Sequence, residues 1–267
     1  MKLKSPVQYT GHDNPLDFFE ILGVKVNVTN LELACQTIQN WIIQNQKVYV
    51  CCAPVSTILD GYKDRQYREV INNSGMTTPD GIPLVWLGRL HKKDVIKRTY
   101  GPDLMLRLCE TGQNKSLKHY FFGGSEESST KLKQRLIEQF SDLKIAGSFV
   151  PSLRRINEIE AEAVIEQINR AQPDVLWVGL GSPKQDYWMA NHRDKLDAPV
   201  IIGVGAAFDF LSGCKKQAPR WMQRSGLEWL FRLCSEPRRL WKRYLLGNAL
   251  FLTLLIRNYF FPQSRQK

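Results

Sequence analysis

Short apolar runs alternate with helical patterns between residues 21 and 204, and this alternation limits the possible folds more than any other feature. Several runs are apolar on both faces, as expected for strands that helices cover on both sides. The alternation is typical of βαβ units and predicts an α/β fold, a Rossmann-like, mainly parallel sheet with helices on both faces. The expected strands are Ile21–Val28, Val48–Cys52, Lys118–Phe122, Lys144–Val150, Val175–Gly179 and Val200–Val204. The expected helices are Leu31–Gln44, Tyr67–Asn73, Pro102–Thr111, Glu126–Phe140, Ile156–Ala171 and Gln185–Lys195.

The pattern changes at both ends of this region. We expect a flexible leader at residues 1–16, an α/β domain at residues 17–212 and a basic helical appendage at residues 213–267. Helical spacing predicts a helix over Trp221–Cys234. A second helix is expected after it, with Ser235 as its N-cap and Pro237 in its first turn.

The appendage carries almost all of the net charge. From Gly213 to the end there are twelve Lys and Arg residues and two acids, which accounts for +10 of the total of +11. Arg238, Arg239, Lys242 and Arg243 fall on one helical face, and the apolar run from Tyr244 to Ile256 is too short to span a bilayer easily. This pattern predicts an amphipathic helix at an anionic membrane surface. Packing of the apolar face on the protein's own core, with the cations in water, is the open alternative.

Cysteine and histidine usage gives little support to a metal centre. The six cysteines form no C-x-x-C pair and are expected to be buried thiols in a reducing cytoplasm. The four histidines show no i, i+4 pairing.

Three glycine turns each follow an expected strand: Phe122–Ser125, Gly179–Gln185 and Gly203–Asp209. Glycines allow backbone amides to approach a phosphate, and parallel strands bring such turns to one edge of the sheet. Glycine turns are also routine at the ends of parallel strands. No turn matches the dinucleotide or P-loop fingerprint, which disfavours an NAD-dependent enzyme.

Asp80 is the best catalytic candidate. It lies in the string Thr77-Thr78-Pro79-Asp80-Gly81, where a carboxylate within reach of a hydroxyl could act as a general base. Pro-Asp-Gly is also a common turn string, so a role as turn former or helix cap stays open on these residues alone.

A series of motifs carries a family resemblance. In order they are PDGIPLVW, YGPDLM, FFGG, VGLGSPKQD-x-W, GVGAAFDFLSG, APRWMQ, GLEWLFRL and EPRR-x-x-R-Y. From about Phe19 to Tyr244 the chain resembles the WecG/TagA/CpsF glycosyltransferases (glycosyltransferase family 26).

The resemblance implies an inverting enzyme at the cytoplasmic face of the membrane. It would move an N-acetylmannosamine-type or related hexose from a UDP-sugar to an undecaprenyl-diphosphate-linked sugar for cell-surface polysaccharide. No cofactor beyond the UDP-sugar co-substrate is implied and, since no D-x-D string occurs, no obligatory metal is expected.

The resemblance also assigns residues. Asp80 matches the general base and Gln185 the active-site glutamine. Arg232 and Arg239 match arginines that meet the acceptor diphosphate, Lys242 stands where a third basic residue is expected, and Arg243 adjoins it. The three glycine turns, rather than the resemblance alone, supply the residues expected at the donor: Gly124, Gly179, Gly181, Ser182, Gln185, Gly205, Ala206, Phe208 and Asp209.

The chain departs from the family at one element. Many members have a Thr-x-Asn element upstream of the base, where this chain has Cys52-Ala53-Pro54, so Ser56 or Thr57 is left to supply a polar group. A nucleic-acid-binding α/β protein that uses the basic tail is the alternative function. The apolar Leu245–Ile256 run beside the charges argues against a nucleic-acid partner. Homo-oligomerisation stays open.

Overall fold

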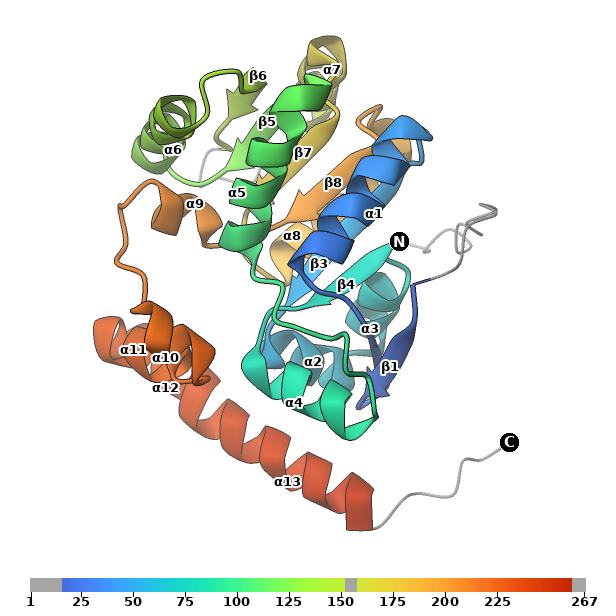
Figure 1. Cartoon of the computed structure of the whole chain (residues 1–267), viewed down its shortest axis with the longest axis vertical. Helices are drawn as coiled ribbons and strands as arrows, with labels where there is room; N and C mark the ends of the chain where they lie inside the picture. Colours follow the sequence, from blue (N-terminus) through green and yellow to red (C-terminus); the bar gives the residue numbers. More distant parts are fainter. Residues whose placement is uncertain (1–15, 152–157, 261–267) are drawn as a thin grey trace.

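The computed structural model describes residues 16–151 and 158–260, and a six-stranded parallel sheet forms its centre (Figure 1). The strands are β3 (Val48–Ala53), β4 (Met76–Pro79), β5 (Lys118–Gly123), β6 (Lys144–Phe149), β7 (Val175–Gly179) and β8 (Val200–Gly203). They lie in the order β4-β3-β8-β7-β5-β6. Because all pairs are parallel, their carboxyl ends meet at one edge, where open α/β sheets bind ligands.

Both faces of the sheet are buried. Successive strand residues point to opposite faces, so that Leu176 and Val178 enter one core while Val175 and Trp177 enter the other. All four side chains are fully buried. Burying such a side chain stabilises the fold by about 1.5–3 kcal/mol, so both faces need a helical cover. The predicted α/β class with a mainly parallel sheet is confirmed.

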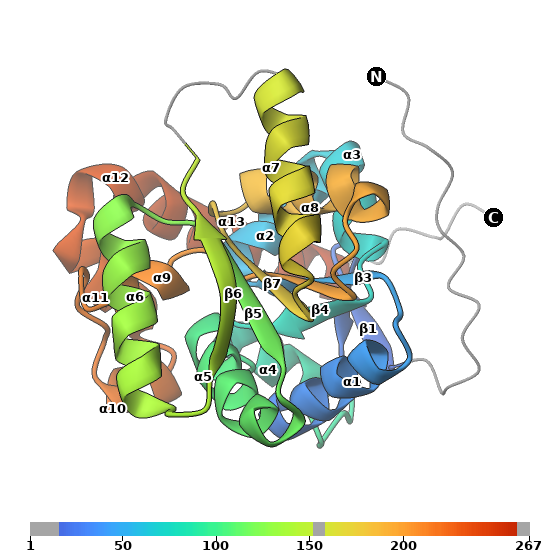
Figure 2. The same ribbon diagram turned by 90° about the horizontal axis from the view of Figure 1, so that it is seen from above.

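Two sets of helices supply this cover, and Figure 2 shows α7 and α8 on one side of the sheet with α1 and α5 on the other. The first set is α2 (Val55–Lys63), α3 (Arg65–Asn72), α4 (Ile82–Leu90), α7 (Glu158–Ala171) and α8 (Lys184–His192). The second set is α1 (Leu31–Ile43), α5 (Gly101–Gly112), α6 (Glu126–Gln139) and α9 (Ala207–Leu211). Short 3₁₀ turns follow α5 at Gln113–Lys115 and α8 at Arg193–Lys195.

The first predicted strand is wrong as a single element. Residues 21–28 belong instead to an antiparallel hairpin of β1 (Phe18–Ile21) and β2 (Val24–Asn27). Leu22 and Gly23 have φ values of 52° and 84°, and positive φ at both central residues is what a tight hairpin turn requires.

The other strands and helices expected between residues 31 and 204 are confirmed to within a few residues, except that residues 156 and 157 of one helix lie outside the described residues. The sequence did not predict β4, α2, α4 or α9. In β4 two of the four residues are threonines, and both are buried with polar partners from distant segments. The Thr77 N–H donates to Asn27 Oδ1, and the Thr78 hydroxyl donates to the Thr99 carbonyl.

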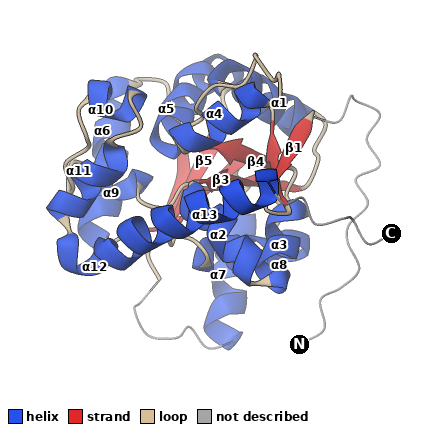
Figure 3. Cartoon of the chain, turned by 90° about the horizontal axis from the view of Figure 1, so that it is seen from below, coloured by secondary structure: helices blue, strands red, loops and turns tan. Residues whose placement is uncertain are grey.

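The C-terminal segment is a chain of helices that crosses the carboxyl edge of the sheet, as Figures 1 and 3 show. It consists of α10 (Arg220–Arg224), α11 (Glu228–Ser235), α12 (Pro237–Trp241), a π-helical turn (Lys242–Leu246) and α13 (Gly247–Phe260). Within residues 16–151 and 158–260, no helix is both long and apolar enough to cross a membrane.

Three expectations for this segment need correction. The helix predicted over Trp221–Cys234 is broken, because Gly226 adopts a φ of 76° between α10 and α11. Ser235 is not an N-cap, since its hydroxyl donates to the Phe231 carbonyl within α11 and Glu236 is the N-cap residue of α12, with no side-chain cap. Cys214 and Cys234 are exposed rather than buried. The placement of Pro237 in a first helical turn is confirmed.

The last helix has two apolar faces with different surroundings. Phe251 and Leu254 are buried in the same core as Ile58 of α2. Leu252 and Ile256, which are 59 % and 58 % exposed, are open to solvent. One face of α13 therefore packs on the domain, as the alternative reading proposed, and the other leaves apolar side chains at the surface.

Candidate functional site

The three glycine turns lie side by side at the carboxyl edge of the sheet, because β5, β7 and β8 are neighbours there. Together with α9 they form a polar cleft of about 490 Å³. The cleft contains all nine residues expected at the donor: Gly124, Gly179, Gly181, Ser182, Gln185, Gly205, Ala206, Phe208 and Asp209. The structure thus brings this set together, while their binding role stays a prediction.

The cleft wall depends on a close approach of backbone to side chain at Gly179. A Cβ atom there would lie 2.6 Å from Phe208 Cδ2, and Phe208 is buried. The Phe208 ring also lines the cleft. A side chain at residue 179 would therefore displace a part of the cleft wall.

We expect Gly179→Ala to lower the free energy of unfolding by about 1–3 kcal/mol, because an extra methyl group must displace a packed ring. Denaturant unfolding measures this. Gly247→Ala is the matched control: its Cβ would meet nothing closer than 3.5 Å inside a helix, so it should be stabilising by about 1 kcal/mol or less. Equal effects of the two substitutions would contradict the packing argument.

Gln185 joins two of the three turns. Its Oε1 accepts hydrogen bonds from the Gly181 N–H at 3.1 Å and the Gly205 N–H at 2.9 Å. Its Nε2 donates to Ser182 Oγ at 3.3 Å, and the side chain is buried. The amide therefore sets the spacing of the two turns that border the cleft.

Asp80 follows the end of β4, at the junction of the cleft with a second cavity. The helix-cap alternative does not hold, because the N-cap residue of α4 is Gly81 and no side chain caps that helix. The Asp80 carboxylate instead accepts a hydrogen bond from Arg98 Nη2 at 3.3 Å. Arg98 Nε also donates to the Asp80 carbonyl at 2.5 Å.

The residues around Asp80 favour a carboxyl group that titrates near neutrality. Burial raises the pKa of Asp80 to about 6, and the charge of Glu228 adds to this rise. The guanidinium groups of Arg98 and Arg232 act in the opposite direction on the same pKa. A base of this pKa is ionised at neutral pH and can still accept a proton.

Sequence reasoning missed Arg98, Tyr100 and Glu228. Arg98 Nη2 donates to Glu228 Oε2 at 2.5 Å, and the Tyr100 hydroxyl donates to Glu228 Oε1 at 3.1 Å. The Arg98 guanidinium also stacks on the Tyr100 ring, 4.0 Å from its centre. Tyr100 is the first residue of YGPDLM, Arg98 lies two residues before it, and Glu228 lies in GLEWLFRL. These positions were the signal, and pairing them needs the tertiary structure.

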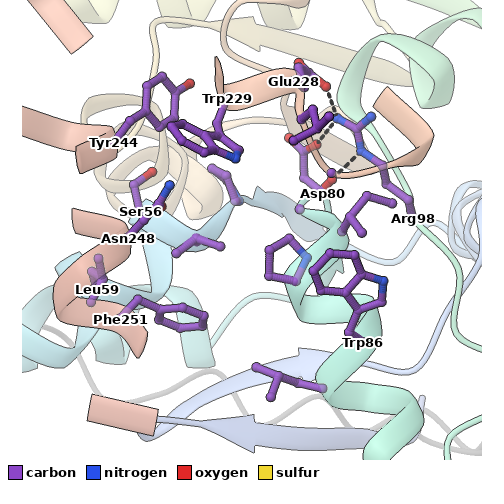
Figure 4. A pocket seen from close by; sticks show the side chains of 18 of the residues that line it. Ser56, Leu59, Asp80, Trp86, Arg98, Glu228, Trp229, Tyr244, Asn248 and Phe251 are labelled. Carbon is purple, nitrogen blue, oxygen red and sulfur yellow. Dashed lines mark hydrogen bonds and ion pairs between the residues drawn. The ribbon is translucent and has the colours of Figure 1, made fainter. Parts of the chain in front are cut away.

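A second, largely apolar cavity of about 550 Å³ lies between the domain and the C-terminal segment. Figure 4 shows Asp80, Arg98 and Glu228 grouped at one part of it, with Trp86, Leu59 and Phe251 elsewhere on its wall. Trp229 and Tyr244 are ring neighbours in its lining, with centroids 6.3 Å apart. Trp86 is 52 % exposed and Leu252 is 59 % exposed, so the lining reaches the protein surface.

The polar cleft and the apolar cavity are joined, since five residues line both: Pro54, Asp80, Tyr100, Arg232 and Arg243. The Arg232 guanidinium has no ion-pair or hydrogen-bond partner among the described residues, and it lies 5.3 Å from the Phe210 ring centre. A positive charge held this way at the junction is suited to an incoming anion.

The structure separates the other basic candidates. Arg243 Nη2 donates to Ser56 Oγ, and Arg239 pairs with Glu236 at 2.7 Å while lining the polar cleft. Lys242 lines neither cavity, and its ammonium lies 5.6 Å from the Trp241 ring centre. Of the four cations expected on one helical face, only Arg239 and Arg243 line either cavity.

The element that departs from the family pattern also reaches the site. Cys52 lines the polar cleft, and Pro54 lines both cavities. Of the two substitutes proposed, Ser56 lines the apolar cavity, whereas Thr57 is buried and lines neither. Of the two hydroxyls only that of Ser56 reaches a cavity, and its substitution for the missing polar group stays a prediction.

In the part of the chain that the structure describes, no group of three or more His, Cys, Asp or Glu residues is arranged to hold a metal ion. The expectation of no obligatory metal stays a prediction.

Comparison with known proteins identifies one family. The sequence model described as "Glycosyl transferase WecG/TagA/CpsF family" matches residues 19–265. A Bacillus subtilis (strain 168) protein is 34% identical over 193 residues, which cover 72% of this chain and 73% of that protein. A Bacillus spizizenii protein is 28% identical over 77% of each chain. A Staphylococcus aureus (strain MRSA252) protein is 24% identical over 84% of this chain and 85% of its own. All three are named N-acetylglucosaminyldiphosphoundecaprenol N-acetyl-beta-D-mannosaminyltransferase.

Proposed function

This chain belongs to the WecG/TagA/CpsF family of glycosyltransferases and is a hexosyltransferase, and we propose the identity of its two substrates. The donor is a UDP-linked hexose of the N-acetylmannosamine type. The acceptor is a sugar carried on undecaprenyl diphosphate, the kind of acceptor that the names of the three relatives specify.

One observation carries this proposal: a polar cleft and an apolar cavity meet at Asp80 and Arg232. Backbone amides of glycine turns suit the diphosphate of a nucleotide sugar. An apolar cavity suits a prenyl chain, and a cation at the junction suits the diphosphate that links this chain to the acceptor sugar. The base would then lie between donor and acceptor.

The reaction that fits this arrangement is a single displacement. The Asp80 carboxylate takes the proton of the acceptor hydroxyl, and that oxygen forms a bond to the anomeric carbon of the donor. The bond from this carbon to the UDP oxygen breaks from the opposite face, which inverts the anomeric centre. The electron pair leaves with UDP, whose added charge the glycine-turn amides and the arginines stabilise.

We further propose that the enzyme works at the inner surface of the cytoplasmic membrane. Trp86 and Leu252 line the apolar cavity and are exposed, and Ile256 is a further exposed apolar side chain on α13. Each Lys or Arg near an anionic leaflet adds about 1 kcal/mol to binding, and the C-terminal segment is rich in both.

The test of substrate identity is an assay of the full chain. UDP-N-acetylmannosamine, UDP-N-acetylglucosamine and UDP-glucose are each offered with N-acetylglucosamine on polyprenyl diphosphate, and products are identified by mass spectrometry. We expect transfer from the first donor, in the presence of EDTA as well. Transfer from none of these donors would reject the proposed substrates, and loss of activity with EDTA would reject the metal prediction.

Vesicle flotation separates membrane binding from the alternative of nucleic-acid binding. The full chain should float with anionic vesicles and shift an oligonucleotide only weakly at physiological salt. Tight, salt-dependent oligonucleotide binding without flotation would favour the nucleic-acid alternative.

Gln185 offers a specific test of the donor cleft. Gln185→Glu keeps an oxygen for the Gly181 and Gly205 amides but adds a negative charge where the UDP diphosphate is expected. We therefore expect folding to be retained and UDP affinity to fall about tenfold or more, by calorimetric titration. Glu127→Gln, at an exposed ion pair on α6, is the control and should leave UDP affinity unchanged. Unchanged UDP binding in Gln185→Glu would place the donor elsewhere.

A further inference from the structure

Glu228 is an acidic residue of the C-terminal segment that reaches the surroundings of the base. It lies in the first turn of α11, and 130 residues of sequence separate it from Arg98. Its two carboxylate oxygens have different partners, because Oε2 accepts from Arg98 Nη2 at 2.5 Å and Oε1 accepts from the Tyr100 hydroxyl at 3.1 Å. Figure 4 shows Glu228, Arg98 and Asp80 linked in a row.

One guanidinium nitrogen serves two carboxylates in this row. Arg98 Nη2 is 3.3 Å from Asp80 Oδ1 and 2.5 Å from Glu228 Oε2. The side chains of Asp80, Arg98 and Glu228 are only 18%, 16% and 12% exposed, so solvent screens these interactions weakly. The shorter contact means that Arg98 pairs mainly with Glu228 and only loosely with Asp80.

The position of Arg98 is fixed from the domain side. The Thr99 N–H donates to the Pro79 carbonyl at 3.0 Å, and the Thr78 hydroxyl donates to the Thr99 carbonyl. This ties the segment of Arg98 to the end of β4, directly before Asp80. The pairing of the guanidinium with Glu228 therefore depends on where α11 lies.

We propose that Glu228 is a positioning residue for sugar transfer. When α11 lies against the domain, Glu228 draws the Arg98 guanidinium away from full pairing with Asp80. This inference rests on the proposed function, in which Asp80 is the base. Arg232 lies one helical turn after Glu228 on the same face of α11. Docking of this one helix then brings a cation to the acceptor diphosphate and prepares the base in the same step.

Removing the charge of Glu228 should leave Arg98 to pair with Asp80 alone, which makes Asp80 a weaker base. The charged and titratable groups that face Asp80 are Arg98, Tyr100, Glu228, Arg232 and Cys52, and Arg243 lines the same junction. Glu228 raises the pKa of Asp80, so its neutralisation lowers that pKa. Burial raises the pKa of Cys52 to about 12, so this thiol stays neutral over the range of the test.

The experiment measures kcat and KM of full-length Glu228→Gln and of wild type with UDP-sugar and the prenyl-diphosphate acceptor. Both proteins are assayed at about ten pH values over roughly pH 4.5–8.5. We expect kcat to fall about tenfold to a hundredfold, the acid limb of kcat/KM to move to lower pH, and the donor KM to stay unchanged. Because both proteins use the same substrates, ionisation of the substrates affects both pH profiles equally, and a shift between the profiles reports on the enzyme. Glu166→Gln, at an exposed ion pair on α7, should match wild type.

Glu228→Asp provides the conservative comparison, because it keeps the charge with a shorter reach. We expect its acid limb to lie closer to that of wild type than the limb of Glu228→Gln does. An unshifted limb in Glu228→Gln, whether or not kcat falls, would overturn the positioning role, since a merely structural loss lowers the active fraction at every pH alike. Absence of transfer in wild type would instead reject the proposed function itself.

Discussion

Asp80→Asn is expected to lower sugar transfer about 100-fold to 10,000-fold, the range that a general base contributes. Asparagine keeps an oxygen that can accept from Arg98 Nη2, which bonds Asp80 Oδ1 at 3.3 Å, but it cannot take up a proton at neutral pH. The glycine turns that form the donor cleft are untouched, so UDP affinity should stay at the wild-type value. Initial rates of product formation and calorimetric titration of UDP measure the two effects.

The same residue predicts a pH dependence. Because burial raises the pKa of Asp80 to about 6, wild-type kcat/KM should fall as pH drops below about 6, where the base becomes protonated. The residual activity of Asp80→Asn should lack this limb. Asp197→Asn, which removes only an exposed carboxylate paired with Lys47, is the control. Substantial transfer by Asp80→Asn, or a retained acid limb, would remove Asp80 as the base.

The parts of the fold that follow from local sequence were predictable. Strands such as β7 and β8 are continuous apolar runs, and the glycine turns after them can be seen in the sequence. The edge strand β4 was not predictable in this way, because Thr77 and Thr78 are buried and their polar partners come from the β2 and α5 sides of the fold. The break at Gly226 likewise depends on a backbone conformation that helical periodicity does not encode.

The candidate site divides along the same line. The nine cleft residues could be expected together because neighbouring parallel strands bring their ends to one edge. The row of Glu228, Arg98 and Asp80 could not, since docking of α11 creates it and no short-range pattern relates residues so far apart. The apolar cavity also depends on the tertiary structure, since residues of α2, α4, α11 and α13 line it together.

Arg232→Ala is expected to lower kcat/KM for the lipid-linked acceptor about 10-fold to 150-fold. Arg232 lines both cavities and has no ion-pair partner in residues 16–151 and 158–260. A hydrogen bond to a charged group contributes about 1.5–3 kcal/mol, which converts to this range. Arg232→Lys keeps the charge without the two-pronged geometry and should fall between wild type and alanine. A water-soluble, short-chain acceptor diphosphate should be used, so that membrane binding does not contribute.

Arg232 and Glu228 stand one turn apart on α11 and act on Asp80 with opposite signs. The charge of Arg232 lowers the pKa of Asp80, so Arg232→Ala should move the acid limb to higher pH, whereas Glu228→Gln should move it to lower pH. Arg224→Ala, at an exposed site on α10, is the control and should change neither the acceptor KM nor the limb. An unchanged acceptor kcat/KM in Arg232→Ala would place the diphosphate away from the junction. Limbs that move in the same direction in both variants would mean that α11 acts on Asp80 by packing rather than by charge.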